Sequence, residues 1–235
     1  MNKAKKTNEV RAFFDRWQIY QKLVSNNYHS HRQAYRILRS QFVRRFPKDG
    51  FSLFDLGCGD AGFMIKLLRG TRVKQYAGVD ISSVALGLAK KNTRELACRK
   101  RFVCADLSKE IGRVRNADII WVGLSLHHLR QKQKAEFFAK CKKALAPGGC
   151  FICYEPFLRE GESRRDFLKR WLSWGAKCWK ALTREENLLH NRHIRQGDFP
   201  EAFSTYKRLA RQAGFTRARS LFTGGAGYLK LMMFE

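Results

Sequence analysis

A glycine-rich segment that carries two carboxylates is the part of the sequence most clearly suited to binding a ligand. FDLGCGDAG, residues 54–62, fits the spacing G-x-G-x-x-G, and Asp80 follows at about the 20-residue distance of a ribose-binding acid. Glycine lets the backbone turn sharply and approach a ligand closely. Asp55 and Asp60 would repel a pyrophosphate at this helix N-terminus, whereas they would attract a cation. The segment predicts a cationic ligand with a ribose; the alternative is a tight turn without one.

Two histidines and a glutamate follow later apolar runs. His127 and His128 come after the run at 119–122, and Glu155 ends the run at 149–154. Either histidine is a candidate general base for an acceptor that arrives protonated, or the pair only shapes a pocket. Glu155 could receive a cationic acceptor, orient a base or be a solvated carboxylate at the rim.

Metal binding is not expected from the spacing of histidines and cysteines. His190 and His193 are spaced H-x-x-H, but no adjacent carboxylate or cysteine completes a ligand set. Cys150 and Cys153 lie in an apolar run predicted to be a strand, where alternation points the two thiols to opposite faces. We expect all seven cysteines to be free thiols in a reducing cytosol.

Strand and helix patterns alternate from residue 51 onward. The expected strands are 52–56, 74–79, 101–105, 118–122 and 149–154, and the expected helices between them are 63–69, 83–94 and 131–145. Continuously apolar strands that alternate with helices indicate a parallel sheet covered on both faces. In such sheets ligands bind beyond the carboxyl ends of the strands, where the candidate residues above fall.

Three further parts flank this core. Residues 1–49 form a basic helical extension, with helices expected at about 7–24 and 29–46. Residues 157–197 form an insertion, with a helix expected at 163–182 whose aromatic stripe contains Phe167, Trp171 and Trp174. This stripe packs on the core and caps the acceptor, stacks on bases, or lies on an anionic bilayer. A helix at 199–213 and a hairpin of strands 218–222 and 228–234 complete a domain expected to span 50–235.

The charge of the chain is its unusual compositional feature. The 235 residues carry a formal net charge of +27, so the surface attracts polyanions such as nucleic acid. A proteome that is basic throughout would give the same net charge without such a partner. No apolar run approaches the roughly 20 residues of a membrane span, and the first residues lack the apolar core of a secretory signal. We expect a soluble cytoplasmic protein with no transmembrane segment, and the oligomeric state stays open.

Several motifs in series resemble those of class I S-adenosylmethionine-dependent methyltransferases. FDLGCGDAG (54–62), YAGVDIS (76–82) and FVCADL (102–107) look like the first three motifs of that family. IIWVGLSLHHL (119–129) and LAPGGCFICYEP (145–156) resemble its fourth and fifth strand regions. The resemblance covers residues 50–156 well and 198–235 loosely. It implies a doubly wound, mostly parallel, seven-stranded Rossmann-like sheet in an α/β fold, with an antiparallel C-terminal hairpin.

The resemblance also implies S-adenosylmethionine as methyl donor and S-adenosylhomocysteine as product. Asp80 then holds the ribose hydroxyls, Asp106 faces the adenine amino group, and His127 falls where related small-molecule O-methyltransferases carry a histidine. Tyr28 and Arg32 are candidates for the methionine carboxylate or the acceptor. The donor-binding residues expected are Asp55, Gly57, Cys58, Gly59, Asp60, Gly62, Asp80, Ile81, Asp106, Leu107, Gly123, Leu124, Tyr28 and Arg32, with Tyr20, His31, His190 and His193 as further pocket candidates.

Four functions remain open at this stage. The leading expectation is O- or N-methylation of a small molecule, and the second is methylation of RNA or protein by way of the basic surface. A nicotinamide-dependent oxidoreductase shares the glycine loop, but the chain has no room for a separate catalytic domain. A non-catalytic scaffold with the same fold is the last alternative.

Overall fold

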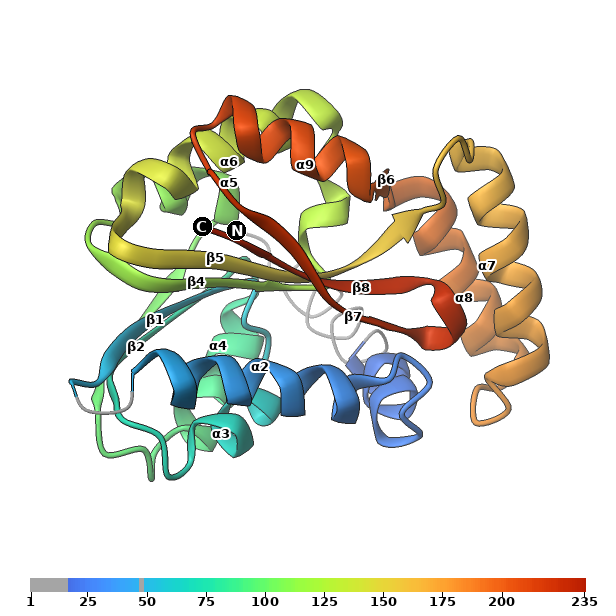
Figure 1. Ribbon diagram of the computed structural model, residues 1–235. Helices are drawn as coiled ribbons and strands as arrows, with labels where there is room; N and C mark the ends of the chain where they lie inside the picture. Colours follow the sequence, from blue (N-terminus) through green and yellow to red (C-terminus); the bar gives the residue numbers. More distant parts are fainter. Residues whose placement is uncertain (1–16, 47–48) are drawn as a thin grey trace, which may run out of the picture.

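One twisted sheet forms the centre of the molecule. The computed structural model describes residues 17–46 and 49–235 (Figure 1). Within them the sheet runs in the order β3-β2-β1-β4-β5-β8-β7, and the short β6 pairs with β5 off this path. The strands are β1 (Phe51–Leu56), β2 (Val73–Asp80), β3 (Arg99–Cys104), β4 (Ala117–Gly123), β5 (Leu145–Leu158), β6 (Glu201–Ala202), β7 (Ala218–Gly224) and β8 (Leu229–Phe234). Strands β1 to β5 are mutually parallel, and β8 pairs antiparallel with both β5 and β7. The expected doubly wound fold is confirmed.

Helices cover both faces of the sheet, as its apolar strands require. On one face lie α2 (His31–Arg45), α3 (Gly62–Leu68) and α4 (Ser83–Asn92); on the other lie α5 (Leu107–Glu110), α6 (Gln131–Ala144) and α9 (Phe203–Gln212) (Figure 1). Each face has its own apolar core. Leu38 and Phe42 of α2 pack in the first core, and Phe137 and Phe138 of α6 pack in the second.

The insertion differs from the single helix expected at 163–182. It contains two helices, α7 (Arg164–Cys178) and α8 (Arg184–Gly197), which stand beyond the end of the sheet toward which β5 points (Figure 1). The break between them follows from a capping box, in which Thr183 Oγ1 accepts from the Glu186 backbone N–H and the Glu186 carboxylate accepts from the Thr183 N–H. The next helix begins at Phe203, not at 199, because residues 201–202 pair with the end of β5.

The aromatic stripe of α7 faces inward. Phe167 and Trp171 are 0% and 4% exposed, and Trp171 packs edge-on against Tyr228 at 5.1 Å between ring centroids. Rings buried in this way are not available to stack on bases or to enter a bilayer. Of the alternatives given above for this stripe, packing on the core is therefore the correct one. No helix in the described ranges is long and apolar enough to cross a membrane.

The N-terminal extension is attached to the insertion. Residues 17–25 are helical, whereas the rest of the helix expected at 7–24 lies outside the described residues. Lys22 forms a 2.8 Å ion pair with Glu186, and the Tyr28 hydroxyl accepts a hydrogen bond from the Ala181 N–H at 3.1 Å. Residues 17–28 and the insertion therefore approach each other across the carboxyl end of the sheet.

Candidate functional site

A cavity of about 330 Å³ lies at the carboxyl end of the parallel strands. The glycine loop and the end of β4 form one side, and residues 17–35 together with α7 and α8 form the other. Its lining includes ten of the predicted residues: Asp55, Gly57, Cys58, Gly59, Asp60, Gly62, Gly123, Leu124, His127 and His128. The tertiary structure thus brings together the glycine loop and the two histidines, which the sequence expectation placed at the same edge.

The glycine loop leaves room for a ligand. Gly57 has φ 83°, its N–H donates to the Val79 carbonyl at 2.8 Å, and a Cβ at this position would lie 2.4 Å from Ser125 Oγ. Gly59 has φ 53°, and no atom lies within 4 Å of the place where its Cβ would be. The first glycine is therefore required by a close approach within the protein, and the second leaves open space above the loop.

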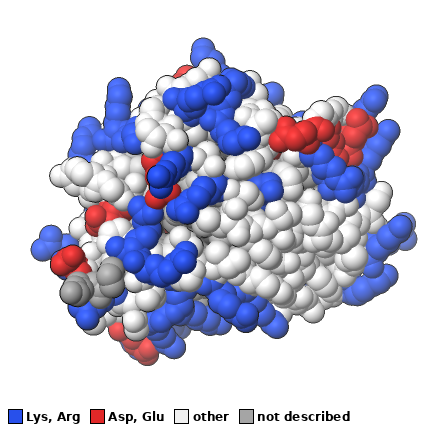
Figure 2. Space-filling view, in the orientation of Figure 1, with Lys and Arg blue, Asp and Glu red and all other residues white. Residues whose placement is uncertain are grey.

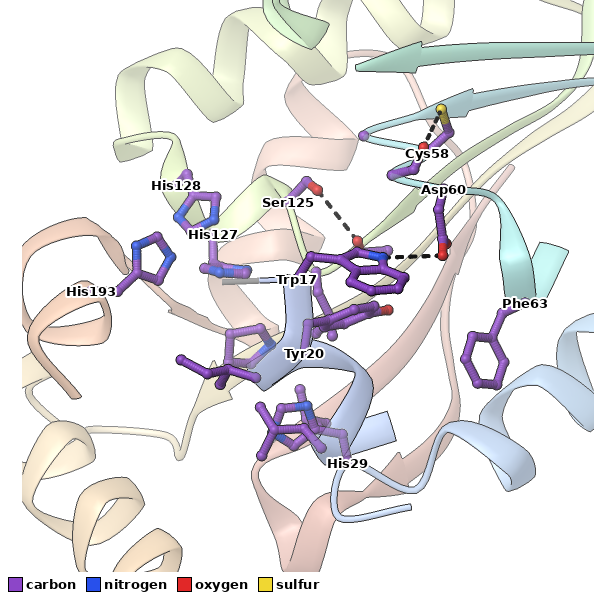
Figure 3. A pocket seen from close by; sticks show the side chains of 18 of the residues that line it. Trp17, Tyr20, His29, Cys58, Asp60, Phe63, Ser125, His127, His128 and His193 are labelled. Atoms are coloured by element: carbon purple, nitrogen blue, oxygen red, sulfur yellow. Dashed lines mark hydrogen bonds between the residues drawn. The ribbon is translucent and has the colours of Figure 1, made fainter. Parts of the chain in front are cut away.

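Two carboxylates supply negative charge beside the loop. Asp55 is buried, and its carboxylate accepts a 2.8 Å hydrogen bond from the Tyr76 hydroxyl. Burial raises the pKa of Asp55 to about 7. Asp60 accepts from Trp17 Nε1 at 3.2 Å, as Figure 3 shows, so the helix at 17–25 is fastened directly above the loop.

The residues expected around adenosine lie outside the cavity lining, at the ends of β2 and β3. The two carboxylate oxygens of Asp80 accept from the backbone N–H groups of Gly59 at 2.9 Å and Ser82 at 2.8 Å. Ile81 beside it is 75% exposed. Asp106 is exposed and accepts from the N–H and hydroxyl of Ser108, at the start of the helix that contains Leu107.

Tyr28 and Arg32 do not line the cavity. The Tyr28 hydroxyl is bound to the insertion as described, and the Arg32 guanidinium donates to the Ser25 carbonyl at 3.0 Å. Both residues hold the chain that leads from residues 17–25 into α2. Of the further candidates, Tyr20, His190 and His193 line the cavity, whereas His31 packs behind His29 at 5.6 Å between ring centroids.

Glu155 is a buried anchor for the turn that carries the histidines. It is 0% exposed, and its carboxylate accepts the backbone N–H groups of Ser125 at 3.0 Å and Leu126 at 2.9 Å. Its Oε2 lies 2.6 Å from His127 Nδ1. The alternative of a solvated carboxylate at the rim is therefore wrong. Among the roles left open above, this geometry favours orientation of His127.

Asp198, at the end of α8, was not found from the sequence. Its Oδ1 lies 3.6 Å from His127 Nε2, so His127 stands between two carboxylates. Burial by itself lowers the pKa of His127, but the negative charges of Asp198 and Glu155 raise it above the ordinary value. No local signal marks Asp198, because a single aspartate after a helix is ordinary and only the return of the insertion brings it to the site.

Histidines gather at this end of the cavity. Five of the six in the chain line it, and Figure 3 shows the rings of His127, His128 and His193 turned toward one another. His29 was not among the residues predicted to line the site. It is 5% exposed and packs on Trp171, with 5.5 Å between the ring centroids. The cavity thus has a glycine-and-carboxylate end and a histidine-and-aromatic end.

Comparison with known proteins agrees with this geometry. Residues 53–149 match the family described as "Methyltransferase domain". The chain superposes on the plantazolicin methyltransferase BpumL in complex with SAH with a TM-score of 0.66 and 14% identity, covering 94% of this chain and 90% of that one. Residues 53–149 are therefore a methyltransferase domain, and the chain has the fold of the methyltransferase structure compared with it. Human N-acetylserotonin methyltransferase in complex with SAM superposes with a TM-score of 0.59 at 16% identity, over 86% of this chain and 51% of that one. This is a likeness of fold alone.

Two curated relatives share more sequence with this chain over a shorter stretch. "N-terminal Xaa-Pro-Lys N-methyltransferase 1" of cattle is 28% identical over 127 residues, which cover 52% of this chain and 57% of that protein. The mouse protein of the same name is 30% identical over 126 residues, covering 52% and 55%. The chain spans only a little over half the length of these relatives.

Proposed function

We propose that this protein is a methyltransferase that transfers the methyl group of S-adenosylmethionine to a small molecule held at the histidine end of the cavity. The donor carries a sulfonium and an ammonium, and the carboxylates of Asp55 and Asp60 provide the negative charge that such cations need. The open space above Gly59 lets the donor approach the backbone. Residues and ligand are therefore chemically matched at this end.

The outer end of the site suits the adenosine part of the donor. Each carboxylate oxygen of Asp80 accepts one backbone N–H, so each keeps a lone pair for a ribose hydroxyl. The exposed side chain of Ile81 offers an apolar surface next to it. Asp106 and Leu107 start the helix after β3, the neighbour of β2 in the sheet, where the resemblance expects adenine.

Methyl transfer from a sulfonium is an in-line displacement. A lone pair of the acceptor atom forms the new bond to the methyl carbon while the carbon–sulfur bond breaks, and its electron pair stays on sulfur as a neutral thioether. The leaving group is already activated, so the protein contributes mainly by aligning the two reactants and excluding water. Burial of the site beneath residues 17–25 and the insertion serves this purpose.

The observation that carries the choice of acceptor is the closure over the cavity. The Lys22–Glu186 ion pair and the Tyr28–Ala181 hydrogen bond join the two coverings, and about 330 Å³ remains beneath them. This volume is at the lower end of the range typical of small-molecule pockets. A compact acceptor fits such an enclosure, whereas a folded RNA or protein would have to present a single flexible end.

A protein or RNA acceptor is the second candidate. The names of the curated relatives refer to protein N-termini, and the net charge of +27 favours anionic partners. Figure 2 shows Lys and Arg from the top through the middle to the lower edge of one face, with a few Asp and Glu among them, beside an uncharged area.

The test is incubation with S-adenosylmethionine labelled on its methyl group and a fractionated cell extract. We expect label in a small-molecule fraction, with a rate that changes little between low and moderate salt. Label in RNA or protein, with a rate that falls steeply and linearly on a log–log plot against salt, would support the second candidate instead. Failure to label any fraction, together with failure to bind S-adenosylhomocysteine, would refute the enzymatic proposal.

A further inference from the structure

We propose that His127, His128 and Asp198 form a binding site for one divalent transition-metal ion. Asp198 Oδ1 lies 3.6 Å from His127 Nε2 and 3.6 Å from His128 Nδ1, and one ligand atom from each residue lies within 4.8 Å of the others. Imidazole and carboxylate ligands bind zinc at about 2.0–2.2 Å, so two ligands of one ion are roughly 3–4 Å apart. Small side-chain rotations therefore suffice to enclose an ion.

The Asp198 carboxylate provides the second, independent observation. Asp198 is 6% exposed, and in the described structure its Oδ1 is buried without a hydrogen-bond partner. Buried polar atoms without partners are rare because they lose hydration and gain nothing in exchange. This oxygen points toward two imidazoles, and a shared cation is the partner that satisfies all three groups together.

The surroundings of His127 are those of a metal ligand. Metal-binding histidines usually donate the N–H of their other ring nitrogen to a carboxylate or carbonyl, which fixes the ring and its tautomer. Glu155 Oε2 stands 2.6 Å from His127 Nδ1, which leaves Nε2 directed at Asp198. Nδ1 of His128 lies 3.1 Å from the Gly197 carbonyl, so an ion bound at this nitrogen takes the place of that contact.

The ligand set indicates the kind of ion. Two imidazoles and one carboxylate suit zinc and its first-row neighbours, whereas magnesium prefers sites built of oxygen atoms alone. Three protein ligands leave one position open, as in catalytic zinc sites. His193 lies just outside the set, with its ring centroid 5.2 Å from that of His128. The H-x-x-H spacing of His190 and His193 therefore does not define this site.

The role of the ion rests on the proposed function, whereas its binding does not. His127, His128 and Asp198 all line the cavity, so the open position is available to an acceptor. A hydroxyl bound there loses its proton to solvent near neutral pH, because the ion stabilises the resulting oxyanion. That oxyanion then attacks the methyl carbon of the donor. The acceptor class inferred is a small hydroxyl compound, such as a phenol or an enol, that becomes a methyl ether.

The test measures metal binding on full-length protein freed of metal by a chelator. Titration calorimetry with zinc chloride should show one tight site, and magnesium chloride should show none. Asp198→Asn and His128→Gln should each weaken zinc binding at least tenfold, and Glu155→Gln should weaken it about 10–100-fold. His190→Gln lines the same cavity outside the ligand set and is the matched control, with unchanged affinity.

Cobalt(II) separates this site from the seven cysteines of the chain. Cobalt bound by nitrogen and oxygen gives visible d–d bands alone, whereas thiolate ligands add intense charge-transfer bands at shorter wavelength. Because His128 is partly exposed, His128→Gln remains informative if Asp198→Asn fails to fold. Thiolate bands only, or wild-type affinity in both variants, would overturn the site. Protein that binds no zinc but still transfers methyl groups would also overturn the metal site, while leaving the proposed function intact.

Discussion

The carboxylate of Glu155 and the imidazole of His127 form a close, buried polar contact at the histidine-and-aromatic end of the cavity. They are 2.6 Å apart, and their side chains are 0% and 8% exposed. Glu155 lies near the end of β5, and His127 lies in the 3-10 turn Leu126–His128, which follows β4. One buried side chain therefore fixes both the turn and the ring that it carries.

Replacement of Glu155 by Gln should lower both stability and activity. Glutamine has one acceptor oxygen instead of two, so buried N–H groups of the turn lose a partner at about 1–3 kcal/mol. Urea denaturation should show this decrease in the free energy of unfolding. Glu136→Gln, on the exposed face of α6, is the control and should unfold like wild type. Equal stability of the two variants would show that the turn does not depend on Glu155.

Donor binding should release a proton from Asp55. Burial raises the pKa of this group to about 7 in the free protein, so at pH 6.5 much of it is protonated. A bound cation favours the carboxylate and lowers that pKa, so affinity for S-adenosylmethionine should rise as pH increases toward and through 7. Calorimetry at pH 6.5 in buffers of different ionisation enthalpy measures the released proton. Asp55→Asn should release none, whereas the exposed Asp49→Asn should behave like wild type; release from Asp55→Asn would contradict this assignment.

The same shift makes stability depend on pH. The folded pKa of Asp55 lies above its unfolded value of 3.8, so the folded state binds more protons than the unfolded state between about pH 4 and 7. The contribution of this group to the free energy of unfolding must therefore decrease as pH rises through that window. Asp55→Asn should become more stable relative to wild type over the same window.

Gly57 and Gly87 should respond in opposite directions to a methyl group. Gly57 has φ 83°, and its Cβ would meet Ser125 Oγ at 2.4 Å, so Gly57→Ala should destabilise the protein by more than about 1 kcal/mol. Gly87 lies within α4 with nothing near its Cβ position, and Gly87→Ala should stabilise by about 0.5–1 kcal/mol. Thermal denaturation of both variants checks the pair. A stable Gly57→Ala would mean that the loop relaxes easily.

Asp80→Ala should weaken S-adenosylmethionine binding by about 1.5–3 kcal/mol, which is the magnitude for hydrogen bonds to a charged group. It removes the acceptor proposed for the ribose hydroxyls and the partner of the Gly59 N–H. Calorimetry with S-adenosylhomocysteine gives the affinity. Asp80→Asn keeps one acceptor oxygen and should lie between wild type and alanine. Unchanged affinity in Asp80→Ala would remove this residue from the donor site.

Much of the glycine-and-carboxylate end of the cavity could be predicted from the sequence because its signals are local. The strand, the glycine loop and the helix of residues 51–68 follow one another along the chain, and backbone sterics alone require glycine at positions such as Gly57. The order of apolar strands then places every loop that follows a parallel strand at one edge. Asp55, Gly59 and His127 meet there for that reason, without any information about packing.

The histidine-and-aromatic end of the cavity was decided by tertiary structure. Asp198 reaches His127 only because Thr183 and Glu186 break the insertion into two helices and α8 returns across the cavity. Trp17 meets Asp60 only because the Lys22–Glu186 pair and the packing of α2 hold residues 17–25 above the loop. Such contacts depend on the burial of groups from distant segments, and no periodicity within one segment records which distant partner will satisfy a buried charge. The sequence by itself therefore determined the sheet and the edge at which the cavity lies, while packing between the flanking helices determined which side chains enclose the histidine end of that cavity.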